Sequence, residues 1–322
     1  MKKKDKIFVA GHKGLVGSAM VEELDKQGFK NIYVSDKKRL NLLNSKEVMQ
    51  YFKLKKFDVV FVCAAKVGGI FSNSTKPYEF LVENLTIQNN IFNACLNFKV
   101  KKVMYMGSSC IYPHHSKIPI KEEYLLTGKL EKTNEAYAIA KIAGLKAAES
   151  LILKYNMDIR CFMPCNLYGK NDRFFDTKNS HVLPALMHRI YEAKKNNLKE
   201  VVVWGDGSPK REFMFSEDLA KNIVKIMTVS KKRFLKNIGD NYFYNIGSNT
   251  EITIKSLCSK ISNIIGYKGK LKFDKSKPNG TPRKYMSKSK IRKVIQLKLT
   301  DISLSLKKTY SYYLKDRNKA KI

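Results

Sequence analysis

Short apolar segments alternate with longer amphipathic segments through the first half of the chain. The short segments are almost continuously apolar and predict strands over residues 6–10, 31–34, 57–63, 102–106 and 158–163. The longer segments have helical periodicity and predict helices over 15–28, 45–55, 77–98 and 134–155, with Ser45 as an N-cap. Strands that are buried on both sides and joined through helices are typical of parallel sheets. The sequence therefore predicts an α/β fold built on a Rossmann-type doubly wound parallel sheet.

The pattern changes after residue 164, where the elements become shorter. It predicts helices over 182–195, 217–227, 254–265 and 301–314, and strands over 200–204, 211–215, 242–246 and 270–273. Residues 230–240 are polar and basic and are predicted to form a surface loop. We therefore expect a first domain over residues 1–165, with a return segment near 211–246, and a smaller mixed α/β domain over 166–322.

Charge is the most unusual feature of the composition. The 322 residues include 62 Lys and Arg against 28 Asp and Glu, which gives a formal net charge of +34. This excess allows a module that binds nucleic acid or another polyanion. However, 53 of the basic residues are Lys and only 9 are Arg, and they are spread over the whole chain. Because nucleic-acid surfaces rely heavily on Arg, we expect no nucleic-acid partner, and we expect the charge to attract small polyanions such as nucleotides.

Apolar runs and cysteines indicate the compartment. No run approaches the roughly 18 uninterrupted apolar residues that a membrane helix needs, so no membrane partner is expected. The apolar stretch 7–10 is too short for the core of a signal peptide. The six cysteines have neither C-x-x-C spacing nor a zinc pattern, which predicts free thiols, no metal site and a reducing environment. We therefore expect a cytoplasmic protein.

A glycine-rich turn follows the first predicted strand and opens the first predicted helix. It reads Gly11, His12, Lys13, Gly14, Leu15, Val16 and Gly17, which is the pattern G-x-x-G-x-x-G. Glycines at this spacing let the backbone approach a pyrophosphate at the helix N-terminus, so the turn predicts a dinucleotide site. After the second strand, Lys37 and Lys38 favour the 2′-phosphate of NADP(H), and Lys13 adds to them. Asp36 in the same stretch keeps NAD open.

A tyrosine and a lysine lie four residues apart on the predicted helix 134–155. This spacing places Tyr137 and Lys141 on one helix face, where an ammonium group lowers the pKa of a nearby phenol. Ser108 follows a predicted strand and faces the crevice in which such sheets bind ligands. Together the three side chains predict a hydride-transfer site, in which Tyr137 protonates a developing alkoxide with the support of Ser108 and Lys141.

These motifs resemble those of the extended short-chain dehydrogenase/reductase family, and the resemblance covers nearly the whole chain. The matching stretches are 11–18, 40–43, 64–70, 107–113, 134–144, 164–169, 180–186, 203–205, 211–213 and 277–284. Within the family, Ala-Lys-Val-Gly-Gly-Ile and Ser-Ser-Cys-Ile-Tyr-Pro are specific to one branch. That branch converts GDP-4-dehydro-6-deoxy-D-mannose to GDP-L-fucose, by 3,5-epimerisation and by reduction of the 4-keto group with NADPH. The resemblance implies the same reaction here.

The resemblance also implies roles for individual residues. It places the base and acid of epimerisation on Cys110 and His181. It places further cofactor contacts at Ala64, Ala65, Pro164, Asn166 and His181, beside the glycine loop and Lys141. It places the GDP-sugar contacts at Arg189, Trp204, Arg211 and Asn279, although Trp204 taken by itself also fits a core residue. Asn279 stands where the family usually has Asp, which weakens a carboxylate contact to guanine.

The sequence leaves alternatives for the function and does not fix the oligomeric state. The resemblance implies a homodimer formed by the helices over 77–98 and 134–155. The main alternative function is a related GDP-deoxyhexose or GDP-deoxyheptose 4-reductase or epimerase of the same family. Two alternatives from other classes are the polyanion-binding module and a sensor of NADP(H) without catalysis. Retention of Ser108, Tyr137 and Lys141 favours catalysis.

Overall fold

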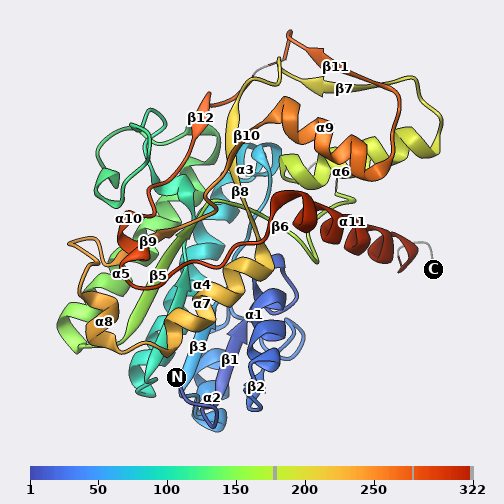
Figure 1. Ribbon diagram of the computed structural model, residues 1–322. Coiled ribbons are helices and arrows are strands. Elements are labelled where there is room, and N and C mark those ends of the chain that lie inside the picture. Colours follow the sequence, from blue (N-terminus) through green and yellow to red (C-terminus); the bar gives the residue numbers. More distant parts are fainter. Residues whose placement is uncertain (177–179, 278, 320–322) are drawn as a thin grey trace.

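A computed structural model describes residues 1–176, 180–277 and 279–319 of the chain. Its main sheet has six parallel strands in the order β2-β1-β3-β4-β5-β9 (Figure 1). The strands are β1 (Ile7–Ala10), β2 (Ile32–Tyr33), β3 (Val59–Val62), β4 (Lys102–Met106), β5 (Ile159–Pro164) and β9 (Phe243–Ile246). The strand order reverses direction between β1 and β3, which is the point where such sheets bind ligands. The predicted Rossmann-type parallel sheet is confirmed.

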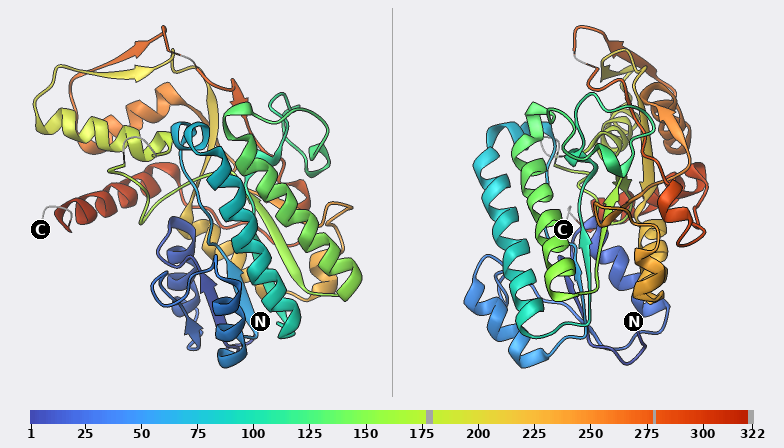
Figure 2. Two further views of the ribbon diagram at one scale, coloured as in Figure 1. Left: turned by 180° about the vertical axis from the view of Figure 1, so that it is seen from behind. Right: turned by 90° about the vertical axis from the view of Figure 1, so that its left-hand side faces the viewer.

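Helices cover both faces of this sheet (Figure 2). On one face, α1 (Leu15–Lys26) packs against α7 (Ser216–Thr228). On the other face, α4 (Pro77–Asn97) lies along α5 (Glu135–Tyr155), and α2 (Ser45–Lys55) packs against α4. The strands between them are buried on both sides, which explains why their sequences are continuously apolar.

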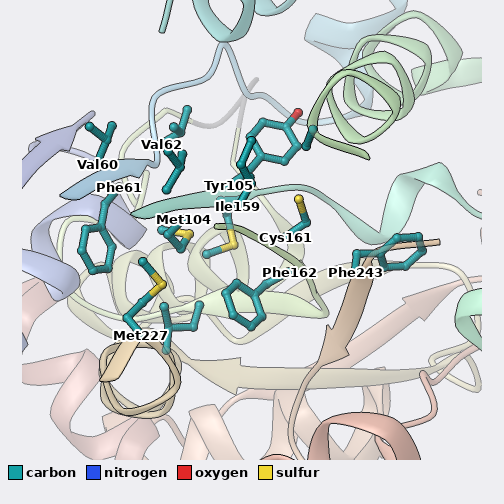
Figure 3. Close-up of a cluster of buried hydrophobic side chains, with 14 of the residues drawn as sticks. Val60, Phe61, Val62, Met104, Tyr105, Ile159, Cys161, Phe162, Met227 and Phe243 are labelled. Carbon is teal, nitrogen blue, oxygen red and sulfur yellow. The ribbon is translucent and has the colours of Figure 1, made fainter. Parts of the chain in front are cut away.

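The core of the sheet shows this two-sided packing at the level of single residues (Figure 3). Phe61, Met104 and Phe162 point toward α7 and meet Met227, and all four are almost completely buried. The next residue along β4, Tyr105, points to the opposite face. Side chains alternate along a strand, so one apolar strand supplies both layers of the core.

A second lobe lies beyond the carboxyl ends of the parallel strands (Figure 1). It contains α6 (Val182–Lys195), α9 (Ile254–Ile265) and α11 (Ile302–Lys319), together with a parallel pair of strands, β7 (Glu200–Trp204) and β11 (Lys270–Asp274). A further small sheet joins the lobe to the main sheet. It is built on β8 (Lys210–Phe215), which pairs with β6 (Asn166–Tyr168), β10 (Glu251–Thr253) and β12 (Arg283–Lys284).

Several short elements escaped prediction. They are α3 (Ile70–Thr75), α8 (Lys231–Leu235), α10 (Ser289–Arg292), η1 (Ser109–Ile111), η2 (Glu122–Tyr124) and η3 (Lys132–Asn134), in addition to β6, β10 and β12. The expected surface loop over 230–240 was wrong in part, because it contains α8. Phe234 of that helix is fully buried and packs edge-on against Tyr244.

The predicted N-cap of α2 was also wrong, by one residue. Asn44 caps the helix, since its side chain accepts hydrogen bonds from the backbone N–H groups of Lys46 and Glu47. Glu47 in turn accepts from the Asn44 side chain and from the backbone N–H of Asn41, which holds the start of the helix in place. Among the described helices, none has the length and apolar character to cross a membrane. The substrate domain expected over 166–322 includes residues 177–179, 278 and 320–322, which lie outside the described residues.

Candidate functional site

The glycine loop forms a cradle that side chains would fill. A Cβ atom on Gly17 would lie 2.1 Å from the carbonyl oxygen of Gly11, and one on Gly11 would lie 2.7 Å from the backbone of Ala64. Gly14 is the N-cap of α1 and offers no side chain to its first N–H groups, while Leu15 and Val16 begin the helix. These N–H groups can bind an anion, so the loop fits the pyrophosphate of a dinucleotide.

A cluster of charges surrounds Asp36 after β2. Lys13 Nζ lies 2.6 Å from the Asp36 carboxylate, and His12 Nε2 lies 3.5 Å from the same oxygen. The hydrogen bond from Lys13 lowers the pKa of Asp36. Since Asp36 is already paired with a cation, it is less able to bind a ribose hydroxyl, while Lys37 and Lys38 remain exposed to meet a phosphate.

The loop that follows β3 lies against the glycine loop. Ala64 and Ala65 are half-buried there, and Ala64 makes the close approach to Gly11. Asn84, a buried residue of α4, accepts a hydrogen bond from the backbone N–H of Lys66 and donates one to its carbonyl oxygen. This clamp holds the loop at the carboxyl end of β3, where the cofactor is expected.

Tyr137, Ser108 and Lys141 come together as predicted. The hydroxyl of Ser108 is hydrogen-bonded to Tyr137. Lys141 is only 4% exposed, its Nζ donates to the carbonyl oxygen of Met106 at 2.9 Å, and it lies 5.8 Å from the centre of the Tyr137 ring. Burial lowers the pKa of Lys141 to about 8.

The expected effect of Lys141 on the phenol is not what the structure shows. Burial raises the pKa of Tyr137 above its ordinary value, and the hydrogen bond from Ser108 only partly opposes this. The reason is that the ring is surrounded by protein, while Lys141 turns its Nζ to the backbone of β4. The phenol therefore stays protonated at neutral pH, which suits a proton donor in a reduction.

Cys110 shares this pocket. It is half-buried in η1, and it interacts electrostatically with both Tyr137 and Lys141. The side-chain amide of Asn134 donates to its sulfur at 3.5 Å. Asn134 was not predicted as a site residue, although its position directly before α5, the helix that carries Tyr137 and Lys141, could have indicated it. A sulfur with an amide donor beside it is placed to carry negative charge.

His181 is the N-cap of α6 and is exposed. Crowding by protein atoms, with a smaller contribution from the positive charge of Arg173, lowers the pKa of His181. Arg173 also donates to the carbonyl oxygen of Val67 at 2.7 Å, so it links the segment before α6 to the loop that follows β3. Among the contacts of the described residues, none joins His181 directly to Cys110. Arg173 was missed from sequence, although Arg is scarce in this chain.

The predicted substrate residues gather around β7 and β8. The guanidinium group of Arg189 donates to the carbonyl oxygen of Val202, and Trp204 is 64% exposed, which excludes a core role. Asn279 accepts from the backbone N–H of Asp206 at 2.8 Å, so its carboxamide closes the turn after β7. A Cβ on Gly280 would lie 3.5 Å from the Arg211 guanidinium group.

The last two predicted residues mark the passage between the sheets. Pro164 ends β5, and Asn166 begins β6 two residues later. The side-chain amide of Asn166 donates to the carbonyl oxygen of Glu212 on β8 at 3.1 Å. Asn166 is thus fixed between the sheet that carries the glycine loop and the strand that carries Arg211.

The motifs, the sheet and the cluster of Ser108, Tyr137 and Lys141 together define a class of protein. The model of the NAD dependent epimerase/dehydratase family matches residues 7–247, which include the glycine loop and the cluster of Ser108, Tyr137 and Lys141. The chain belongs to the NAD dependent epimerase/dehydratase family.

More particular similarities follow within that family. The chain is 46% identical over 320 residues to the putative GDP-L-fucose synthase 2 of Arabidopsis thaliana, covering 98% of this chain and 94% of that one. It is 41% identical to the GDP-L-fucose synthase of Escherichia coli K12, covering 98% of each chain. Among solved structures, a GDP-mannoheptose C4 reductase of Campylobacter jejuni with NADP bound superposes with a TM-score of 0.87 at 34% identity, over 98% of this chain and 99% of that one.

Proposed function

We propose that the protein converts GDP-4-dehydro-6-deoxy-D-mannose to GDP-L-fucose, by 3,5-epimerisation followed by NADPH-dependent reduction at C4. The observation that carries this proposal is the cluster at the end of β4, which brings a proton donor for an alkoxide close to a thiol with an amide donor. Tyr137 supplies the first and Cys110 the second, and both interact electrostatically at the end of β4. The similarity to GDP-L-fucose synthases over nearly the whole chain supports the same substrate.

The residues present fit NADP(H) as the cofactor. The cradle of Gly11, Gly14 and Gly17 would hold the pyrophosphate at the N-terminus of α1. The exposed Lys37 and Lys38 would meet the 2′-phosphate. When bound, this cofactor supplies the hydride for the reduction at C4 of the sugar. The structure of a related reductase with NADP bound supports NADP(H) over NAD(H).

For the reduction, the chain provides a proton and holds the ketone. The C4 oxygen accepts hydrogen bonds from the hydroxyl groups of Ser108 and Tyr137. As hydride reaches C4, the phenol of Tyr137 gives its proton to the developing alkoxide, which completes the alcohol. The raised pKa of Tyr137 keeps that proton in place before reaction. Lys141, protonated below its pKa of about 8, stabilises the phenolate that remains.

For epimerisation, the C4 ketone acidifies the hydrogens at C3 and C5. The sulfur of Cys110, as a thiolate, removes a proton from one of these carbons, and an enolate forms with its charge on the C4 oxygen. Ser108 and Tyr137 stabilise that oxyanion by hydrogen bonding. His181 returns a proton to the opposite face of the carbon, which inverts the centre. Cys110 then releases its proton to water and His181 takes one up from water, after which the same exchange at the second carbon completes the epimerisation.

Arg189, Arg211, Trp204 and Asn279 are proposed to bind the GDP half of the substrate. The two guanidinium groups suit the diphosphate, and the exposed indole of Trp204 can stack on guanine. The carboxamide of Asn279 is held in the turn after β7, and any contact with the base is made from that position. Its neutral charge, where the family resemblance implies an Asp, predicts weaker selection for guanine.

We also propose the division of labour that the sequence suggested. Residues 1–165, with the return segment near 211–246, hold NADP(H), and residues 166–322 hold the GDP-sugar. Two separate hydrophobic clusters support this division, one around the main sheet and one among α6, α9 and α11.

A cytoplasmic homodimer completes the proposal. The outer faces of α4 and α5 expose apolar residues, Tyr78 and Val82 on one helix and Ile139 and Leu153 on the other. These helices lie side by side, so a second copy can cover them. Sedimentation of the Ile139→Lys variant tests the dimer, because a buried lysine at such an interface dissociates it. The free cysteines agree with a reducing compartment.

The function is tested with GDP-4-dehydro-6-deoxy-D-mannose and NADPH in deuterated water. We expect loss of NADPH absorbance and a GDP-L-fucose product with deuterium at C3 and C5. The alternative, a reductase of a related GDP-deoxyhexose or GDP-deoxyheptose, is favoured by the similarity to the GDP-mannoheptose C4 reductase. That alternative predicts reduction without deuterium at either carbon, so the label decides between the two.

A further inference from the structure

A buried ion pair joins β8, the strand that carries Arg211, to Lys288. Lys288 Nζ is 2.6 Å from a carboxylate oxygen of Glu212, and their side chains are 2% and 1% exposed. The second carboxylate oxygen of Glu212 accepts a hydrogen bond from the backbone N–H of Met286 at 3.2 Å. The mechanism above uses neither side chain, yet burying two charges is costly unless their geometry is closely defined.

Glu212 is attached to two proposed site residues. It follows Arg211 on β8, so whatever fixes Glu212 also fixes the backbone from which the Arg211 guanidinium group extends. The backbone carbonyl of Glu212 accepts from the side-chain amide of Asn166, which orients Asn166. A Cβ on Gly247 would lie 2.5 Å from the Glu212 carboxylate, so the surrounding chain leaves room for the carboxylate and little else.

Lys288 belongs to a segment, residues 285–288, that also contacts the catalytic side. Ile120 donates its N–H to the carbonyl oxygen of Tyr285 at 2.8 Å, and accepts from the N–H of Ser287 at 2.7 Å. The same carbonyl of Ile120 accepts from the side-chain amide of Asn245, whose oxygen accepts from the hydroxyl of Tyr112. Tyr112 lies two residues after Cys110 in the motif loop. The segment therefore connects β8 to the loop that carries the thiol.

We infer that Glu212 and Lys288 are positioning residues, whose ion pair fixes β8 so that Arg211 faces the nucleotide-sugar. This inference rests on the proposed function, because Arg211 is taken as a ligand of the diphosphate. Neither side chain touches the substrate, since both are buried behind the strand. Loss of the pair lets β8 shift relative to residues 285–288 and weakens GDP binding. NADP(H) binding changes little, because the glycine loop, Lys37 and Lys38 belong to the main sheet, and the side chain of Asn166 is held by the backbone carbonyl of Glu212 and not by the ion pair.

The neighbouring strands offer a matched control. Glu251 on β10 is the register partner of Glu212, and it pairs with Arg283 on β12. That pair is close to β8 and of the same charge type, but the Arg283 side chain is 49% exposed. A Glu251→Gln variant therefore removes one carboxylate next to β8 without leaving a buried charge unpaired, and surface pairs of this kind contribute little.

The experiment measures binding of GDP by calorimetry and of NADPH by its fluorescence, for the wild type and for Lys288→Met, Lys288→Arg and Glu251→Gln. For Lys288→Met we expect the Kd for GDP to rise about tenfold or more, as a shift of a charge-paired ligand by about an ångström would cause. The Kd for NADPH of Lys288→Met stays within about twofold of the wild-type value. In Glu251→Gln, the Kd for GDP and the Kd for NADPH both stay within about twofold. Lys288→Arg, which keeps the charge, recovers part of the loss.

If Lys288→Met does not fold, the Glu212→Gln/Lys288→Met double variant leaves no unpaired charge, and its Kd for GDP is measured instead. A folded variant that binds GDP as the wild type does overturns the inference, as does one that loses GDP and NADPH binding equally. Wild-type protein that binds GDP and NADPH but does not turn over the keto sugar overturns the proposed function alone. The positioning role of the pair is then still decided by the GDP titrations.

Discussion

Replacing Lys141 by methionine is expected to stabilise the protein while abolishing reduction. The side chain is 4% exposed, and among the described residues it has no carboxylate partner. Its Nζ is held by the Met106 carbonyl oxygen and faces the ring of Tyr105 at 5.2 Å. Burial lowers its pKa from an ordinary 10.5 to about 8. A lysine in that state is a charge held away from water, which opposes folding.

The size of the effect follows from the pKa. Lowering it from 10.5 to about 8 corresponds to roughly 3 kcal/mol of stability lost at neutral pH. Methionine has a similar length and removes this loss, but it leaves the carbonyl of Met106 without a donor, which costs about 1 kcal/mol. The Lys141→Met variant should therefore be more stable at pH 7 by about 2 kcal/mol. The same variant loses the cation that stabilises the phenolate, so its reduction rate falls by about a hundredfold or more.

The pH dependence of the free energy of unfolding tests this prediction. Between about pH 8 and 10.5 the unfolded chain keeps the Lys141 proton that the folded chain has lost. The unfolded state then binds more protons, so the stability of the wild type rises with pH through this window, and that of Lys141→Met lacks this rise. Denaturant unfolding at pH 7 and at pH 9.5, where half or more of the effect has developed, measures both. The control is Lys146→Met, on the same helix but half-exposed and paired with Glu149. A Lys141→Met variant less stable than the wild type at pH 7 would refute the reasoning.

Three further predictions concern the site. Tyr137→Phe removes the proton donor, so NADPH oxidation with the keto sugar should fall by about 100- to 10,000-fold. Deuterium should still enter C3 and C5, more slowly, because Ser108 alone then stabilises the enolate; an equal fall in both rates would contradict the separate role of Tyr137 in reduction. Cys110→Ala should stop deuterium uptake at both carbons by NMR and leave the Kd for NADPH unchanged, and uptake at the wild-type rate would remove Cys110 from the mechanism. Lys13→Glu places a second carboxylate beside Asp36, so the KM for NADPH should rise about tenfold more than that for NADH, and equal rises would contradict a 2′-phosphate contact.

Most of the fold could be predicted from local sequence patterns. Apart from the half-buried edge strand β2, the strands of the main sheet were found from sequence because they are buried on both sides, and such a strand has no polar face. The N-cap of α2 was misplaced because Asn44 and Ser45 are both good capping residues, and only the hydrogen bonds distinguish them. The helix α8 was missed because its charged neighbours conceal a single anchoring residue, Phe234.

The site was predictable where chemistry depends on spacing along the chain. Tyr137 and Lys141 are one helical turn apart, so their proximity follows from the sequence. The direction of their pKa shifts did not follow, because it depends on how deeply the fold buries each group. Glu212 and Lys288 are separated by 76 positions, and nothing in either local sequence marks them as partners. Contacts of that kind arise only when β8 and residues 285–288 are brought together.

Burial shifts Tyr137 and Lys141 in opposite directions on the pH scale, but it favours the uncharged form of both. A neutral phenol is the form that can protonate an alkoxide, so its shift favours reduction directly. A neutral amine cannot stabilise the phenolate, so the shift of Lys141 works against the reaction if it goes too far. With a pKa of about 8, Lys141 remains mostly protonated at pH 7. The pocket is therefore dry enough to hold the proton on Tyr137, yet it still keeps the cation that the product of proton transfer needs.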